Sequence, residues 1–154
     1  MSSTIQHILT RRGALRLAAL AIAWGGLLSA AAADDALSTL TVRIDQISGR
    51  SGTLHVELFT ADTYDAGTAV LSRSVKVNGT SANVTFVGVP AGTYGVHVVQ
   101  DLNQSGKQER TLIGASSEPQ GYSNYTGRVK KPSFRDIRFA TSTGDNKVIV
   151  HLHN

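Results

Sequence analysis

The chain has 154 residues, which is room for one domain with a core of its own but not for two such domains beside a leader. It has no cysteine, so disulfides, thiolate metal sites and thiol nucleophiles are excluded. The formal net charge is +4, but Arg11, Arg12 and Arg16 lie in the first 33 residues, so the remainder carries only +1. That balance gives no reason to expect a nucleic-acid partner.

Residues 1–33 have the pattern of an export signal. Arg11 and Arg12 precede an apolar run at residues 17–28, which is shorter than the roughly 20 residues that span a bilayer. Ala31-Ala32-Ala33 then offers a peptidase site. The arginine pair resembles the twin-arginine consensus, with Ala14 where that pattern prefers Phe, and an ordinary secretory signal is the alternative. We expect cleavage after residue 33, leaving a periplasmic or secreted domain at 34–154 with no stable transmembrane segment.

The rest of the chain alternates apolar and polar residues with a period of two, which is typical of β-strands. We find no convincing amphipathic helix. About seven short strands separated by turns predict an all-β fold, a single antiparallel β-sandwich. The expected strands lie at 40–45, 54–58, 75–77, 84–86, 94–99, 137–139 and 148–152.

Two turns predict strand pairings. Asn78-Gly79 is a strong hairpin signal and should join the strands on either side of it. Residues 142–145 should likewise join the last two strands as a pair.

The strand phase predicts which side chains are buried. The phase turns the histidines outward, and Tyr94 should pack at one end of the sandwich with its hydroxyl bonded to nearby backbone. The expected core includes Phe86, Val96, Val98, Val150 and Leu152, and the outward histidines are His55, His97, His151 and His153.

Residues 101–132 form one long interruption, and loops of that length are usually functional or disordered. Its first part resembles a calcium loop, but Leu112 stands where a bidentate Glu should close the shell, so another oxygen such as that of Glu118 would be needed. We expect calcium affinity no better than roughly 10⁻⁴ to 10⁻³ M. The alternative is an Asx-type turn whose side chains accept from backbone amides. The candidate metal ligands are Asp101, Asn103, Ser105 and Glu109, with Gly106 at the sharp turn.

Several motifs in a fixed order resemble a secreted bacterial family catalogued as domain of unknown function 2141. The resemblance covers about residues 40–152 and implies an immunoglobulin-like or transthyretin-like sandwich, an exported protein and no assigned reaction. Gln100 stands where the family usually has His, which makes a metal role less secure here. The motifs are Val89-Pro90-Ala91-Gly92-Thr93-Tyr94, Asp101-x-Asn103-x-Ser105-Gly106-Lys107, Ile113-Gly114, Gly121-Tyr122-Ser123-Asn124 and Pro132-Ser133-Phe134.

Catalytic and transition-metal sites have weaker signals. A small periplasmic hydrolase would need His or an acid beside Ser116, Ser117 or Ser123, and no Gly-x-Ser-x-Gly elbow is present. His151 and His153 share a strand face and could bind copper or zinc, although such pairs are usually a solvated strand edge.

Residues 128–138 carry a local charge of +4, directly after aromatic and amide side chains suited to holding sugars or peptides. The segment is either a solvated loop with one structural tyrosine or a rim that binds an anionic envelope component. We therefore predict a non-catalytic binding module of the cell envelope, acting through residues 101–132 on an anionic or glycan ligand, with no cofactor unless calcium binds. A calcium-stabilised or transition-metal-binding protein and a small hydrolase are the alternatives. The predicted ligand-binding residues are Tyr122, Asn124, Tyr125, Arg128, Lys130 and Lys131.

Overall fold

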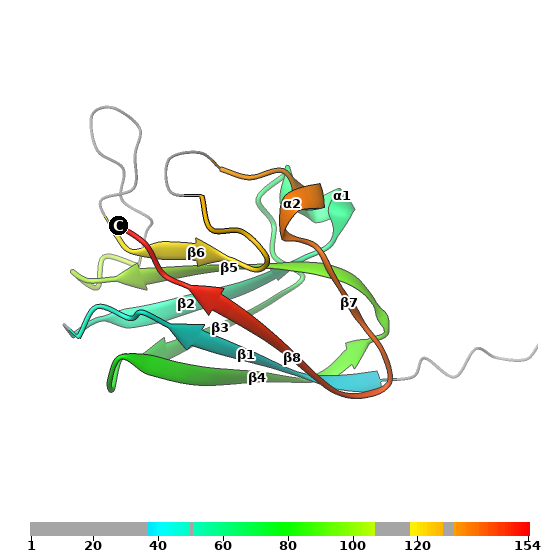
Figure 1. The fold of residues 1–154 in the computed structure, drawn as a ribbon, viewed down its shortest axis with the longest axis horizontal. Coiled ribbons are helices and arrows are strands. Elements are labelled where there is room, and N and C mark those ends of the chain that lie inside the picture. The colour runs from blue at the N-terminus through cyan, green and yellow to red at the C-terminus, as the bar shows by residue number, and fades with distance from the viewer. Residues whose placement is uncertain (1–36, 50, 107–117, 128–130) are drawn as a thin grey trace, which may run out of the picture. The chain divides into compact units, whose positions relative to one another are not determined.

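The computed structural model describes residues 37–49, 51–106, 118–127 and 131–154 (Figure 1). These residues belong to one compact unit, Ala33–Asn154. The predicted signal segment lies outside them, as do Glu109, Ser116, Ser117, Arg128 and Lys130. Within the described ranges, no helix has the length and apolar character needed to cross a membrane.

Strands dominate the described part of the chain, with two one-turn helices between them. In chain order the elements are β1 (Leu37–Asp45), β2 (Thr53–Phe59), α1 (Ala61–Tyr64), β3 (Leu71–Lys76), β4 (Ser81–Pro90), β5 (Gly92–Asp101), β6 (Gln120–Tyr122), α2 (Phe134–Ile137), β7 (Phe139–Thr141) and β8 (Gly144–His151).

The strands form two sheets, which Figure 1 shows as two layers. Sheet A has the order β4-β1-β8, and sheet B has the order β3-β2-β5-β6, with β7 also paired to β5. The neighbours are antiparallel except β1 and β8, which run parallel. The predicted all-β fold is confirmed, with β6 as a strand that the alternation pattern did not predict.

The core lies between the sheets and follows the predicted alternation. Leu40, Val42 and Ile44 of β1 point inward, opposite Leu54, Val56 and Leu58 of β2. The five residues expected in the core are all buried. Tyr94 is buried as well, and its hydroxyl donates to the Pro90 carbonyl at 3.0 Å, as predicted.

The predicted hairpin at Asn78-Gly79 is wrong, because β3 pairs with β2 in sheet B while β4 pairs with β1 in sheet A. The connection between β3 and β4 passes from one layer to the other and is held by a backbone hydrogen bond at each end. The Val77 amide donates to the Gly52 carbonyl at 3.0 Å, and the Ile47 amide donates to the Thr80 carbonyl at 3.1 Å. Strands in opposite layers can both turn apolar faces toward the shared core, which local turn chemistry does not reveal.

The predicted pairing of the last two strands is also wrong. β7 pairs with β5 and β8 pairs with β1, so residues 142–143 carry the chain between layers. Asn146 closes this connection by bonding the Ser142 amide and carbonyl at 3.1 and 2.7 Å. Ile137, expected in a strand, lies in α2 because it packs on the outer face of β5 at Gly95.

Two glycines allow other elements to approach sheet B closely. A Cβ at Gly95 would lie 2.6 Å from Ile137 Cδ1, so the absence of a side chain lets α2 sit on β5. A Cβ at Gly121 would overlap the His151 carbonyl oxygen, so β6 can lie against β8. Figure 1 shows α1, α2 and β6 on the same side of the sandwich.

Candidate functional site

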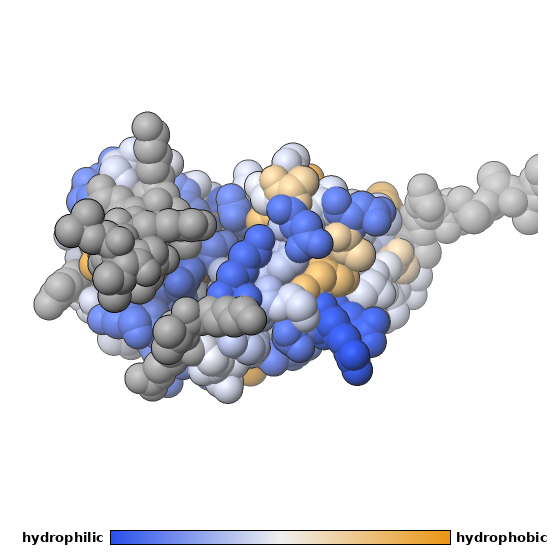
Figure 2. Space-filling model, turned by 90° about the horizontal axis from the view of Figure 1, so that it is seen from above, coloured by the Kyte–Doolittle hydropathy of each residue, from blue (hydrophilic) through white to orange (hydrophobic). Residues whose placement is uncertain are grey.

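A second, smaller apolar cluster lies outside the main core, where α1 and α2 cover sheet B. Phe59, Tyr64 and Ile137 are buried there, and Phe59 and Tyr64 meet edge to face with ring centroids 5.5 Å apart. Seen from above, this part of the surface carries hydrophobic side chains among hydrophilic ones (Figure 2). The partly buried residues packed against the cluster are Ala69, Tyr122, Tyr125 and Phe134.

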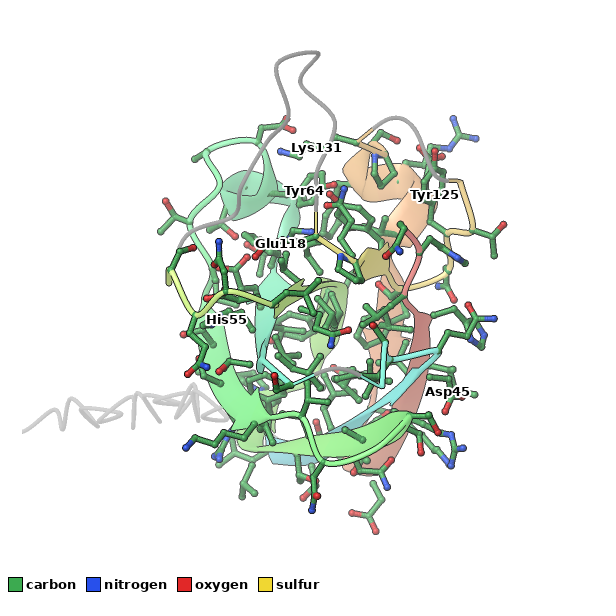
Figure 3. The ribbon with its side chains drawn as sticks, turned by 90° about the vertical axis from the view of Figure 1, so that its left-hand side faces the viewer. Asp45, His55, Tyr64, Glu118, Tyr125 and Lys131 are labelled. Atoms are coloured by element: carbon green, nitrogen blue, oxygen red, sulfur yellow. The ribbon has the colours of Figure 1, made fainter. Side chains whose placement is uncertain are left out.

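Tyr64 connects α1 with the segment that leads into α2. Its hydroxyl donates to the Pro132 carbonyl at 3.0 Å. Lys131 Nζ donates to the Tyr64 carbonyl at 3.4 Å and lies 4.4 Å from the centre of the Tyr64 ring, a cation–π contact (Figure 3). Burial is the main cause that raises the pKa of Tyr64, so the hydroxyl stays protonated and donating.

Ser133 and Asp136 define the start of α2. The Ser133 amide and hydroxyl donate to Asp136 Oδ2 at 3.0 and 2.6 Å. These two hydrogen bonds lower the pKa of Asp136, and the one from the Ser133 hydroxyl has the larger effect. The Asp136 carboxylate is therefore ionised near neutral pH. The spacing of Ser and an acid three residues apart is a helix-start signal that sequence analysis could have used.

An open pocket of about 400 Å³ lies beside Lys131, Pro132 and the start of α2. Its lining combines carboxylates, an ammonium, a hydroxyl and one aromatic ring. The described residues that line it are Asp65, Tyr125, Lys131, Pro132, Ser133 and Asp136. We refer to it as the Tyr125–Lys131 pocket.

The predicted ligand-binding residues have different roles in this region. Tyr125 and Lys131 line the pocket. Tyr122 stacks on His97 with centroids 4.3 Å apart, and it touches Tyr125 edge to face at 6.3 Å. Asn124 has a positive φ of 55° and donates through Nδ2 to the Arg138 carbonyl at 2.8 Å, so its side chain fixes the turn. Sequence analysis missed Asp65, which only the tertiary fold brings to the pocket. It also missed Ser133 and Asp136, which lie close to Lys131 in sequence and carry the helix-start signal described above.

His97 lies on the outer face of β5, in the predicted phase, but it is buried at 8 % exposure and so does not face solvent. Tyr122 covers one face of its ring. Its Nδ1 lies 3.6 Å from Glu57 Oε2, and its Nε2 lies 3.2 Å from Gln120 Oε1. The outer face of β5 is thus a packed surface, because the cross-strand neighbours Glu57 and Tyr122 lie against His97 and α2 packs at Gly95.

Ser123 is fully buried and bonds only to backbone among the described residues. Its hydroxyl donates to the Ile137 carbonyl at 2.6 Å and accepts from the Val96 amide at 2.9 Å. This arrangement ties β5 to the end of α2. It offers no His or carboxylate to activate the hydroxyl, so the contact expected of a hydrolase nucleophile is missing at Ser123.

The Asp101 loop forms side-chain to backbone hydrogen bonds. Asp101 Oδ1 and Oδ2 accept from the amides of Ser105 at 3.1 Å and Gly106 at 2.8 Å, and Asn103 Oδ1 accepts from Ser105 at 2.9 Å. This is the geometry of the Asx-type alternative. No group of three or more His, Asp or Glu residues is placed to hold a metal in the ranges described, and the calcium prediction stays a prediction.

Asp101 is buried at 2 % exposure. Burial is the largest influence on its pKa and acts to raise it, but amides of Gly106, Ser105 and Gln104 and a hydrogen bond from His55 together lower it. His55 Nε2 lies 3.5 Å from Asp101 Oδ2, and His55 Nδ1 lies 2.9 Å from the Ser74 hydroxyl. Nearby, Glu118 Oε1 accepts from the Leu102 amide at 3.3 Å.

We predict that Asp101→Ala lowers the free energy of unfolding by about 2 kcal/mol with or without calcium, because the Ser105 and Gly106 amides lose a charged acceptor. The lowered pKa makes this stabilisation present above the unfolded-state pKa of about 3.9 and lost as pH falls through the folded-state value. Urea unfolding at pH 7 and pH 3, in chelator and in millimolar calcium, checks both statements. A destabilisation seen only with calcium would support a metal site instead.

The histidines at the end of the chain lie where the two sheets meet. The His153 amide donates to the Gln120 carbonyl at 2.8 Å, and the Gln120 amide donates back at 2.9 Å. His151 and His153 are partly buried, unlike a solvated strand edge. Copper or zinc binding by this pair stays untested.

Fold and site together define a two-layer β-sandwich with a small pocket beside two capped helical turns. The family model described as an uncharacterized protein conserved in bacteria (DUF2141) matches residues 42–149, and the chain belongs to that family. The resemblance drawn from the sequence motifs is thereby confirmed. Neither a curated protein nor a solved structure matches the chain.

Proposed function

We propose that this protein is a non-catalytic binding module of the cell envelope whose ligand occupies the Tyr125–Lys131 pocket. The observation that carries the proposal is the pocket itself. It is open to solvent and has a volume of about 400 Å³. Its lining brings together an aromatic ring and several hydrogen-bonding groups, the mixture that orients small ligands.

Preorganisation of the lining also supports binding. Asp136 is fixed by Ser133, and Lys131 is fixed against Tyr64 by a hydrogen bond and a ring contact. Side chains already held in place lose little conformational freedom when a ligand arrives, which favours affinity. Tyr64, Tyr125 and Lys131 lie near one end of the described domain, well separated from Asp45 (Figure 3).

We expect Tyr125→Ala to weaken ligand binding at least about tenfold, because the substitution removes the aromatic wall of the pocket. The test is thermal stabilisation of the purified protein by a panel of oligosaccharides and short peptides. Tyr125→Phe keeps the ring and should keep most of the effect. Val87→Ala, at a 73 % exposed position on β4, is a control expected to behave as wild type. A ligand that stabilises wild type and Tyr125→Ala equally would place its site elsewhere, and a panel with no stabilising member would count against the proposal.

Export belongs to the same proposal and is supported by the pattern of residues 1–33. Replacing Arg11 and Arg12 with Lys should stop export if the twin-arginine route is used, because that pathway recognises the paired arginines. Cell fractionation with N-terminal sequencing measures this, and the exported protein should begin near Asp34. Export of the Lys variant that stops only when the general secretory pathway is inhibited would contradict the twin-arginine route.

A further inference from the structure

We infer that the Tyr125–Lys131 pocket selects a neutral, hydroxyl-rich saccharide over an anionic ligand. The inference rests on the proposed function, since it names the ligand class for the same pocket. It is carried by the charge of the lining, by the engagement of its one described cation, and by the support behind its aromatic ring.

The described lining has more negative than positive charge. Asp65 and Asp136 contribute two carboxylates, and Lys131 contributes one ammonium. Hydrogen bonds from Ser133 keep Asp136 in its anionic form. A ligand phosphate or carboxylate would enter beside these like charges, which is electrostatically unfavourable, and Arg135, whose charge acts on Asp136, offsets part of that cost.

The Lys131 ammonium is already directed toward α1. It donates to the Tyr64 carbonyl and lies over the Tyr64 ring, so turning fully to an anion would break both contacts. An ammonium has three donors, however, and one can still meet a neutral hydroxyl without leaving Tyr64. Lys131, which the local charge of the sequence suggested as an anion-binding residue, is therefore better placed to donate one hydrogen bond to a neutral ligand.

A sugar hydroxyl matches this mixed lining because it both donates and accepts. It can donate to the Asp65 carboxylate or to Asp136, and it can accept from Lys131. An anionic group offers acceptors alone, so at that position it brings a like charge to Asp65 instead of a hydrogen-bond donor. A neutral polyhydroxylated ligand is therefore the class that pairs with every polar type present.

The Tyr125 ring is a supported wall for the apolar face of a sugar ring. Tyr122 meets it edge to face at an interplanar angle of 82°. A Cβ at Gly127 would overlap the Tyr125 hydroxyl and ring, so Gly127 is the residue that lets the ring lie where it does. Tyr122 therefore supports the ring before any ligand arrives, and Gly127 leaves the space that the ring occupies.

The inference is tested by calorimetric titration of the purified protein with neutral and anionic trisaccharides. The neutral probes are maltotriose, cellotriose and N-acetylchitotriose, and the anionic probe is trigalacturonate. We expect a neutral trisaccharide to bind at least about tenfold more tightly than trigalacturonate. Tyr125→Ala and Gly127→Ala should each weaken that binding about tenfold or more, while melting temperatures confirm folding.

A matched pair of carboxylate variants probes the polar wall. Asp65→Ala should weaken binding about fivefold, whereas Asp62→Ala changes a carboxylate in the same helical turn that is outside the pocket lining and should bind as wild type. Tighter binding of trigalacturonate, lost in Tyr125→Ala, would overturn the saccharide selectivity but keep the pocket as the site. Binding of no trisaccharide, while a peptide binds at Tyr125, would also overturn it. Trisaccharide binding that Tyr125→Ala leaves unchanged would overturn the proposed function as well.

Discussion

Gly121→Ala is expected to lower the free energy of unfolding by about 3 kcal/mol, at the upper end for overpacked positions. An added Cβ would overlap the His151 carbonyl oxygen, which is backbone and cannot rotate away. It would also lie 2.9 Å from Val150 Cγ1 in the core. The substitution must therefore separate β6 from β8, where Gln120 and His153 exchange two backbone hydrogen bonds.

Equilibrium urea unfolding of the purified variant measures this loss. Gly49→Ala is a suitable control, because nothing lies within 4 Å of a Cβ there and the residue is exposed. We expect that control to stay within about 0.5 kcal/mol of wild type. Equal stability of the Gly121 and Gly49 variants would mean that β6 does not lie against β8.

Ser123→Ala is expected to cost about 3 kcal/mol, since it leaves two buried backbone groups without their partner. The Val96 amide loses its acceptor and the Ile137 carbonyl loses its donor. The bond from the Ser123 amide to the Val96 carbonyl at 3.0 Å should remain, so the fold should persist at reduced stability. Ligand binding should weaken too, because the chain from Tyr122 to Tyr125 is anchored at this serine.

Thermal and urea unfolding of Ser123→Ala test the bridge, with Ser81→Ala as an exposed serine control on β4. Ser123→Thr retains a hydroxyl but adds a methyl group at a fully buried position, so it should recover little stability. A loss below about 0.5 kcal/mol for Ser123→Ala would show that the bridge is not formed in solution.

The sandwich and its core were predictable because alternation depends only on which face of a strand meets the core. Val96 and Val98 are buried as their phase requires, and His97 occupies the opposite face. Pairing partners were not predictable, because the sequence around Asn78-Gly79 carries no information about which layer each strand joins. The parallel pairing of β1 with β8 likewise depends on long-range packing.

The candidate site was predictable only in part. Tyr125 and Lys131 were identified from residue type and local charge, and both line the pocket. Asp65 was missed because it directly follows α1, far in sequence from the other pocket residues. Only the tertiary fold brings it to them, as the hydrogen bond from Tyr64 to Pro132 across 68 residues of sequence shows. Asn124 fixes a turn through its amide, a role that residue type alone does not separate from ligand binding, and its predicted ligand contact stays a prediction.

The most direct test of the central claim is a map of backbone amide chemical-shift changes in the isotopically labelled protein on titration with the tightest-binding neutral trisaccharide. The account predicts changes concentrated at Asp65, at 125–127 and at 131–136, with little change on the outer face of sheet A. Changes centred on sheet A or on the Asp101 loop, with the Tyr125 and Ser133 amides unmoved at saturation, would contradict it.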